Sequence, residues 1–395
     1  MIIRALRKLG TGQKRSALDT PSEAKAKSVS LGNLSQWQLI IMRFKRHRLA
    51  VFSLFVLVAL YMVALFAEFF APYSANFRDL DYMYAPPQLP KFNLEHGWHL
   101  DAVVKDRDPI TFQLHYRVVP DEVVPLSFFV KGEPYSVLGL FEWDRRFFGV
   151  DHRALDAEPG EGAYVFYFLG ADRYGHDIFS RVIFGARISL SIGLIAIFLT
   201  FILGIVIGGI SGYKGGYVDD LIQRFIEIVN SFPQLPLWLA LAAVMPTDWP
   251  LMVTYLGITV VLSLLGWTGL ARVVRGKILS LREEDYAVAA RLLGANHRRV
   301  LFRHLVPGFT SHIIVVLTLS VPAMILGETA LSFLGLGLRP PVVSWGVMLQ
   351  DTMQLQAVAN YPWLLLPVLP IIVTVLAFNF LGDGMRDAAD PYSSR

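Results

Sequence analysis

Apolar residues gather along this chain in long stretches that carry almost no charge. A helix that crosses a bilayer needs roughly 20 predominantly apolar residues, and six stretches reach about that length. They are Leu49–Ala67, Ile188–Tyr213, Ile228–Thr247, Trp249–Ala271, Leu305–Gly327 and Trp363–Leu381. Asn230, Pro233 and Pro236 interrupt the third stretch, and packed spanning helices tolerate such breaks because their neighbours satisfy the freed backbone groups. The pattern predicts an all-α polytopic membrane protein with six transmembrane helices.

Lysine and arginine are distributed unevenly between these stretches. Residues 1–48 hold eleven of them against two acids, and residues 272–303 hold eight against three. Residues 72–168 hold nine against fifteen acids, a net charge of −6. Because cytoplasmic segments carry the excess of positive charge, we expect both termini and the loop 272–304 in the cytoplasm. The predicted order is a basic N-terminal tail (1–48), a first transmembrane helix (49–71), an extracytoplasmic insertion (72–168), a core with five transmembrane helices (169–382) and a C-terminal tail (383–395).

The insertion has a pattern of its own. Strings such as "ITFQLHYRVV" alternate at strand-like spacing, with Pro and Gly around them. A loop this long without structure is unusual, so we expect an ordered, mixed α/β or β-containing segment. Seven aromatic side chains are candidates for its core: Trp98, Phe112, Tyr116, Phe128, Phe129, Trp143 and Phe147. Two interpretations stay open, a surface that docks a partner over a pathway and an insertion that packs only on itself.

Composition supports a membrane protein, and the motifs that would indicate an enzyme are missing from the sequence. The 395 residues are 54% hydrophobic and 17% charged, with a mean hydropathy of +0.47, whereas soluble domains carry about 25% charged residues. Cysteine is absent, which excludes disulfides and thiolate metal sites. His96 and His99 lack a third ligand at a fixed spacing, so no metal site is expected. The string nearest to a phosphate-binding loop, "VRGKILS", lacks its first Gly and the hydroxyl after Lys277. We therefore expect no catalytic residue and no cofactor bound by this chain.

Residues 281–308, "LREEDYAVAARLLGANHRRVLFRHLVPG", predict a short helix, a break and a second helix. The acids at 283–285 favour a helix N-terminus. Gly294 is placed to end this helix in the left-handed conformation, and Asn296 is placed to cap the next one. Pro307 marks the turn into the fifth apolar stretch. The expected result is an L-shaped element on the cytoplasmic face.

This segment resembles the EAA loop of ABC importer permeases. Ala289, Ala290, Gly294 and Pro307 fall on its spacing, while Val288 replaces the usual Glu. The resemblance implies a coupling helix that seats in a cytoplasmic ATPase, and the alternative is an amphipathic helix lying on the membrane surface. The residues implied in coupling are Glu284, Asp285, Tyr286, Ala289, Ala290, Gly294 and Pro307.

Four more strings resemble the same family, in the same order. "FLGADRYGHDIFSRVIFGARISL" (168–190) resembles the signature that precedes the second span in this family. Residues 212–228 resemble the family's cytoplasmic turn between spans. Residues 328–349 resemble the segment between the last two spans, and 382–391 the closing motif. The signature residues are Gly170, Asp172, Gly175, Asp177, Ser180, Arg181, Gly185 and Arg187. Ala171 and His176 depart from the usual Thr and Arg.

The chain is thus identified as similar to the inner-membrane permeases of the dipeptide/oligopeptide/nickel ABC importer family. The long insertion resembles the variant found in microcin C-type and oligosaccharide/opine-type importers. The resemblance implies a translocation-pore subunit that works by alternating access with a homologous second permease, two ATP-binding subunits that hold ATP and Mg, and an extracytoplasmic solute-binding protein. It implies no nucleic acid partner. Peptides or peptide-like compounds, oligosaccharides or opines, and nickel remain alternative substrates.

One acid, Glu328, abuts the fifth apolar stretch. Ionisable residues at such positions are functional candidates, so Glu328 is a candidate pathway residue, and the alternative is hydrogen bonding to the "SFLGLG" turn. A different class, an ion-coupled secondary transporter, would need charged residues near mid-membrane and inverted repeats. We find neither in the sequence.

Overall fold

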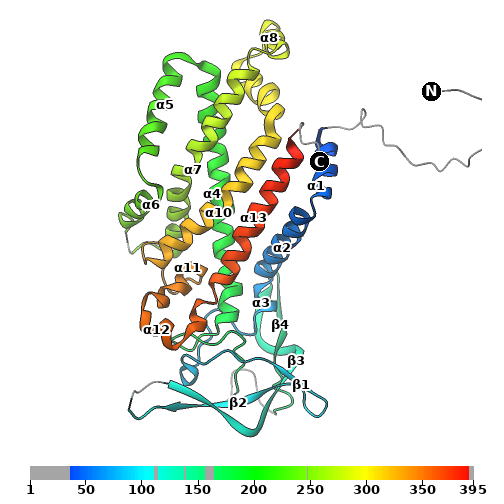
Figure 1. The fold of residues 1–395 in the computed structure, drawn as a ribbon, viewed down its shortest axis with the longest axis vertical. Coiled ribbons are helices and arrows are strands. Elements are labelled where there is room, and N and C mark those ends of the chain that lie inside the picture. Colours follow the sequence, from blue (N-terminus) through cyan, green and yellow to red (C-terminus); the bar gives the residue numbers. More distant parts are fainter. Residues whose placement is uncertain (1–35, 111–113, 138, 156–163, 247, 391–395) are drawn as a thin grey trace, which may run out of the picture.

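The computed structural model describes residues 36–110, 114–137, 139–155, 164–246 and 248–390. It consists of a bundle of long helices with a β-sheet at one end (Figure 1). The short helices α1 (Gln36–Arg46) and α8 (Asp285–Leu292) lie at the opposite end of the bundle, together with the end of α13 (Val368–Ala389). The inserted strand-containing segment on a helical membrane core confirms the predicted fold class.

Within the part of the chain that the structure describes, five helical segments are long and apolar enough to cross a membrane. They are α2 (Arg48–Leu65), α4 (Ile178–Lys214), α7 (Leu251–Leu281), the run His297–Phe333 that ends in α10 (Thr310–Phe333), and the run Pro362–Ala389 that ends in α13. Each corresponds to one of the predicted spans. The second begins ten residues earlier than predicted, because the polar signature residues of 178–187 are helical as well.

The third predicted span, Ile228–Thr247, is not one continuous helix. Two helices, α5 (Gly216–Ser231) and α6 (Gln234–Ala243), are bent by 86° at the break between them. Pro233 explains the break, because proline disfavours the helical conformation of the residue before it, and Phe232 is extended at φ −88° and ψ 137°. The predicted turn at 212–228 is also mostly helix. Only if the bent pair counts as one span does the total reach six.

Helix α4 lies at the centre of the bundle and packs closely on α7. Glycines at every fourth residue, Gly204, Gly208 and Gly212, face α7, and a Cβ at Gly208 would lie 2.4 Å from the carbonyl oxygen of Ala271. Small residues at this spacing let spanning helices approach closely. Ile205, Leu270 and the partly buried Phe201 pack in the same core, and this tight contact makes α4 and α7 the rigid centre of the bundle.

The insertion forms a four-stranded antiparallel sheet in the order β1-β2-β3-β4. Its strands are β1 (Lys91–Asn93), β2 (Gly97–Arg107), β3 (Leu114–Val137) and β4 (Phe141–Val150). Helix α3 (Ala67–Phe70) and the 3₁₀ turn η2 (Leu80–Tyr82) connect α2 to the sheet. At the same end of the molecule, four short helical elements join α10 to α13. They are α11 (Trp345–Met348), η5 (Leu349–Met353), α12 (Leu355–Asn360) and η6 (Pro362–Leu365).

The predicted aromatic core of the insertion is wrong. The buried cluster consists of Leu100, Ala102, Val124, Leu126, Val150 and Phe166. Five of the predicted aromatics, Trp98, Phe128, Phe129, Trp143 and Phe147, are instead 37 to 56% exposed. Tyr116 packs partly buried in a second cluster, and Phe112 lies outside the described residues. The short aliphatic side chains of β2 and β3 are covered by Phe166 from the chain returning to α4, which strand patterning alone did not reveal.

Candidate functional site

The predicted helix–break–helix element projects from the bundle at the end opposite the sheet (Figure 1). Helix α8 ends at Leu292, and Gly294 adopts φ +83°. The amide of Ala295 donates to the carbonyl of Ala290 at 3.0 Å, closing the helix end in the glycine-dependent motif. Asn296 caps α9 (His297–Arg299), its side chain accepting from the amide of Arg299 at 2.9 Å. The local structure predicted here is confirmed.

The remaining predicted coupling residues surround this break. Glu284 is the N-cap of α8, and Asp285 lies in its first turn. Pro307 lies exposed in the 3₁₀ turn η4 (Val306–Phe309), which follows the π-helical turn η3 (Val300–Leu305) and leads into α10. Departures from α-helical geometry of this kind often mark a hinge. The element therefore has a break at Gly294 and a departure from α-helical geometry around Pro307.

The two faces of α8 differ in burial. Ala287 is fully buried and packs in a cluster with Val300 and Leu305, whereas Ala289 is exposed and Ala290 partly so. At the apex, Leu292 and Leu293 are 83% and 88% exposed, and Tyr286 is 45% exposed. Exposed apolar surface of this kind marks an interaction site. The two leucines were not predicted as site residues, although adjacent leucines before a glycine in a charged loop were an available signal.

Hydrogen bonds connect the element to the ends of α4 and α7. Arg282, which ends α7, donates from one terminal nitrogen to the carbonyls of Gly212 at 3.1 Å and Tyr213 at 3.3 Å. Arg291 on α8 donates to the carbonyl of Arg282 at 2.9 Å. The imidazole of His297 lies 3.1 Å from the hydroxyl of Tyr213. These contacts join α8 and the start of α9 to the end of the central helix α4.

An ion pair near the same end joins three helices. Arg275 on α7 donates from Nε to Oδ1 of the buried Asp219 on α5 at 2.6 Å, and its terminal nitrogen contacts the other carboxylate oxygen. Ser211 of α4 also donates to this carboxylate, and Gln223 donates to the Ser211 hydroxyl at 3.1 Å. Sequence reasoning missed this network, because its members are far apart along the chain.

The signature residues lie at the other end of α4, next to the sheet. Gly170 and Gly175 adopt φ of +83° and +74°. A Cβ at Gly175 would lie 1.8 Å from the carbonyl oxygen of Asp79, and one at Gly170 would lie 2.8 Å from that of Ala85. These two glycines are thus required where the signature loop crosses the chain that leaves α2. The loop holds the insertion against the bundle.

Asp172 is the centre of the signature cluster. Its carboxylate accepts hydrogen bonds from the amides of Tyr174 at 2.8 Å and His176 at 3.0 Å. The imidazole of His176 and the guanidinium of Arg181 contact the same carboxylate. Burial opposes ionisation of Asp172, but the hydrogen bonds from His176 and the charge of Arg181 outweigh it and lower its pKa. The structure brings Asp172 and Arg181 together as one ion pair.

Asp177 and Ser180 begin α4. Asp177 is its N-cap, and its carboxylate accepts from the amide of Ser180 at 2.8 Å and from the Ser180 hydroxyl at 2.6 Å. The Ser180 hydroxyl in turn accepts from the amide of Tyr73 at 3.1 Å. Burial raises the pKa of Asp177 to about 7. The cap of α4 therefore also fixes the segment that follows α3.

The last two signature residues join α4 to its neighbours. Arg187 forms a bidentate pair with Glu68 of α3, at 2.9 and 2.8 Å, a geometry among the strongest for ion pairs. Gly185 lies against Trp345, whose indole nitrogen donates to the carbonyl of Val182 at 3.0 Å. All eight signature residues thus serve to connect α4 to surrounding segments.

A cavity of about 400 Å³ opens beside the signature cluster. Its wall carries the charged side chains Arg78, Asp172, Arg173, Arg181 and Asp351, together with His176. Arg173 pairs with Asp351 at 3.1 Å. The two prolines Pro340 and Pro341 and the end of α11 complete the wall. This arrangement offers a polar recess at the sheet end of the bundle.

Glu328 is fully buried in α10. Its carboxylate accepts from the hydroxyls of Ser332 at 2.9 Å, Ser344 at 2.8 Å and Ser189 at 3.0 Å. Ser332 belongs to the "SFLGLG" turn and accepts from the amide of Leu338 at 3.0 Å. The predicted hydrogen bond between Glu328 and this turn is confirmed. Glu328 joins α4, α10 and the segment before α11.

The bundle of spanning helices defines a multi-pass membrane protein. The sequence of residues 204–394 matches the binding-protein-dependent transport system inner membrane component family, and residues 35–87 match the N-terminal TM domain of oligopeptide transport permease C. The chain belongs to this family of binding-protein-dependent permeases, and the prediction of a transport subunit of an ABC importer is confirmed.

Two relatives illustrate the similarity. The dipeptide transport system permease protein DppC of Bacillus subtilis is 40% identical over 226 residues, which cover 57% of this chain and 68% of that protein. The glutathione transport system permease protein GsiD of Pectobacterium atrosepticum is 36% identical over 258 residues, covering 65% and 79%. Among solved structures, an amino acid ABC transporter aligns at a TM-score of 0.38 and 16% identity over 51% of this chain and 91% of that one, too distant a likeness to support an argument.

Proposed function

We propose that this chain is the translocation subunit of an importer that takes up peptides or peptide-like compounds by alternating access. The relatives carry dipeptide and glutathione in their names, which supports this class of substrate. The cavity near Asp172 adds support, because its wall carries both positive and negative side chains. A peptide presents an ammonium and a carboxylate group, so such a recess suits its passage.

The exposed apex of α8 carries this proposal. Tyr286, Leu292 and Leu293 offer an apolar contact to an ATP-binding subunit, and Glu284 and Asp285 add charge at the start of the helix. Ala289 and Ala290 allow a close approach, Gly294 forms the break that ends α8, and Pro307 lies in the turn that leads into α10. Force applied at α8 then reaches α4 through Arg291 and Arg282. Nucleotide biases the pathway only if α8 makes different contacts in the two states of the ATPase.

The proposed arrangement places α8 and both termini in the cytoplasm and the sheet outside. A homologous second permease completes the pore, and two ATP-binding subunits bind ATP and Mg and supply the energy. A solute-binding protein delivers the substrate to the sheet side. The charge asymmetry between residues 72–168 and 272–303 supports this orientation.

We assign roles to the insertion and to the core on the basis of this proposed orientation. The insertion at 72–168 serves to dock the binding protein, and the β1–β2 end of the sheet is the part that carries this role. Phe92 and Trp98 are both exposed there, with ring centroids 5.3 Å apart. Exposed aromatic side chains of this kind are typical of protein contacts. The core at 169–382 forms the pathway, with the coupling loop 272–304.

Glu328 acts on the pathway by setting the shape of its outer end. Its three serine partners lie on different segments, so loss of the carboxylate frees α4 from the turn after α10. The signature residues act together with Glu328, because they hold α2, α4 and the insertion in fixed positions relative to one another.

Uptake by the reconstituted complex tests the proposed function. The complete importer in proteoliposomes, supplied with ATP inside and binding protein outside, is offered radiolabelled dipeptides, tripeptides, glutathione, an oligosaccharide and Ni²⁺ in separate assays. We expect ATP-dependent accumulation of a peptide or of glutathione. Accumulation of only the oligosaccharide or only Ni²⁺ would overturn the substrate class. Accumulation driven by an ion gradient without ATP would overturn the mechanism.

A further inference from the structure

The hairpin formed by β3 and β4 carries an exposed apolar surface, which we call the aromatic patch. Its residues are Phe129, Leu140, Phe141, Trp143 and Phe147. Leu140, at the closed end of the hairpin, is 78% exposed, and Phe141 is 55% exposed. Large apolar side chains that gather on one surface mark a contact with another molecule or with a membrane. The location of the patch decides between these partners.

The aromatic patch lies against the continuation of the first spanning helix. The ring of Trp143 stacks on that of Phe69 in α3, with centroids 5.8 Å apart and an angle of 13° between the planes. Phe147 contacts both Phe69 and Phe70, at 5.9 and 5.7 Å. From Phe147 to Trp143, the contacts of strand β4 therefore move back along α3, toward α2.

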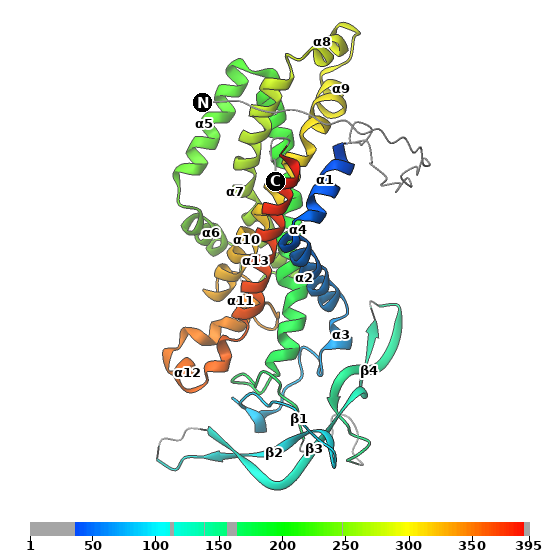
Figure 2. The same cartoon turned by 45° about the vertical axis from the view of Figure 1, so that its right-hand side comes forward.

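The closed end of the hairpin points the same way. Figure 2 shows it beside α3 and turned toward the end of α2. Trp143 and Phe141 are two positions apart along strand β4, a rise of about 7 Å. Along a helix the same distance corresponds to roughly four to five residues, which places Phe141 near the level of Leu65. The tip of the hairpin thus reaches the depth at which α2 ends.

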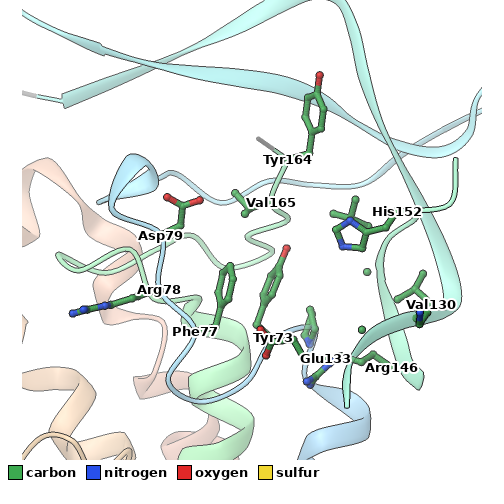
Figure 3. A pocket seen from close by; sticks show the side chains of 15 residues that line it. Tyr73, Phe77, Arg78, Asp79, Val130, Glu133, Arg146, His152, Tyr164 and Val165 are labelled. Carbon is green, nitrogen blue, oxygen red and sulfur yellow. The ribbon is translucent and has the colours of Figure 1, made fainter. Parts of the chain in front are cut away.

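Buried polar contacts hold the hairpin in this position. Arg146 is buried, and its guanidinium donates to the carbonyls of Glu68 at 3.0 Å and Ala71 at 3.1 Å. Figure 3 shows Arg146 near Tyr73 and Glu133, at a cavity of about 150 Å³ where the hairpin meets the segment after α3. Because Arg187 of α4 binds the Glu68 carboxylate, the hairpin is held against α3, which is itself bound to the spanning helix α4.

The backbone conformation of Phe129 indicates that the surrounding structure keeps its ring in the aromatic patch. It adopts φ +57°, a conformation that a bulky side chain rarely takes and that persists only where its surroundings enforce it. Arg145 donates to the carbonyl of Phe129 at 3.1 Å, and the Phe129 ring lies 6.1 Å from that of Phe69. The strained backbone thus directs an apolar ring outward beside α3 rather than into the core of the sheet.

The aromatic patch is continuous with the outward face of α2. Phe55, Val58, Met62 and Leu65 are exposed along this helix, which is the least buried of the five spans. Aromatic side chains are enriched where spanning segments leave the bilayer, and an apolar face can lie buried in the headgroup region. We propose that the aromatic patch inserts into the interfacial region of the outer leaflet and holds the insertion against the membrane surface.

This membrane contact goes beyond the proposed function and leaves the β1–β2 end of the sheet free for a binding protein. It is tested with spin labels on single cysteines, since the chain itself has none. Leu140→Cys and Phe141→Cys probe the tip of the hairpin. Leu94→Cys, in the β1–β2 turn and 97% exposed, is the matched control and is measured without the binding protein, because this end of the sheet is the proposed docking site. Each is placed in the full importer complex in lipid nanodiscs, with partner cysteines replaced and uptake verified.

The measurement compares collisions of each label with oxygen, which concentrates in lipid, and with a water-soluble nickel chelate. We expect the oxygen-to-nickel ratio to be severalfold higher at positions 140 and 141 than at position 94, and unchanged when the binding protein is removed. A ratio at 140 and 141 equal to that at 94 would overturn the proposal, because the tip would then lie in water. Low collision rates with both reagents would also overturn it, since a partner protein would then cover the patch.

Discussion

Arg275 of α7 and Asp219 of α5 form an ion pair in which Nε lies 2.6 Å from Oδ1. The carboxylate also accepts a hydrogen bond from Ser211 of α4. Asp219 is almost completely buried, while about a third of the Arg275 side chain is exposed. The pair therefore joins the bent α5–α6 element to the rigid α4–α7 centre, close to the loop that carries α8.

Replacing Arg275 by alanine should destabilise the protein, because it leaves a buried carboxylate without its main partner. We expect a loss of about 2 kcal/mol in the free energy of unfolding, measured as a lowered melting temperature of the purified complex. The matched control is Arg224→Ala, which removes an exposed pair with Glu227 on the same helix and should cost less than about 1 kcal/mol. Equal losses for both variants would show that the buried pair has no special role.

The double variant Asp219→Asn with Arg275→Gln separates charge from packing. It removes both charges but keeps an acceptor for Ser211. We expect it to recover part of the stability that Arg275→Ala loses, since no unpaired charge remains. A double variant as unstable as the single one would assign the effect to lost packing of the arginine side chain.

Gly294 permits a second test, on coupling. Its φ of +83° is unfavourable for any residue with a Cβ, at a cost of about 1–2 kcal/mol, and most of all for a β-branched residue. Gly294→Val should therefore shift α8 and lower transport and ligand-stimulated ATP hydrolysis several-fold, while membrane insertion stays normal. The control is Gly276→Val, on α7 with open space and no positive φ. Wild-type uptake and ATPase stimulation in Gly294→Val would contradict a coupling role for this bend.

The local structure of the coupling element was predictable because each of its signals acts over a few residues. A glycine after a helical run and an asparagine two residues later specify a stop and a start, and Gly294 and Asn296 adopt these roles. The spans were predictable for a similar reason, since their length and hydropathy depend on contiguous sequence. The bend at Phe232 was signalled by Pro233, but its angle of 86° depends on packing.

Long-range relationships were not predictable in this way. Asp219 and Arg275 are 56 positions apart, and neither stands in a local pattern that indicates the other. In the insertion, Phe166 covers Leu100 and Val124 from a different part of the chain, so its aromatic residues could not be sorted into core and surface. The signature residues were found by resemblance, and only the structure shows that Asp172 pairs with Arg181 and Arg187 with Glu68.

Topology is tested by labelling single cysteines from one side of the membrane. Leu94→Cys lies in the β1–β2 turn and Arg298→Cys follows α8, and both positions are exposed. In intact spheroplasts, an impermeant maleimide should label position 94 and spare position 298, and permeabilisation should make both reactive. The opposite pattern would place α8 outside and refute docking to a cytoplasmic ATPase.

The buried cap of α4 should make stability depend on pH. Burial raises the pKa of Asp177 from 3.8 to about 7, so its favourable contribution is complete below about pH 4 and is lost as the pH rises through 7. Asp172 has a lowered pKa and stays ionised throughout this range, so it adds no opposing slope. Asp177→Asn keeps a side-chain acceptor for the helix amides and cannot ionise.

We expect the melting temperature of Asp177→Asn to rise relative to that of the wild type between pH 5 and pH 8. Asp177→Ala, which lacks the acceptor, should be less stable than the wild type by about 1 kcal/mol at low pH. The difference between the wild-type and Asp177→Asn curves reports on this carboxyl group. Parallel curves across that range would show that Asp177 does not titrate there.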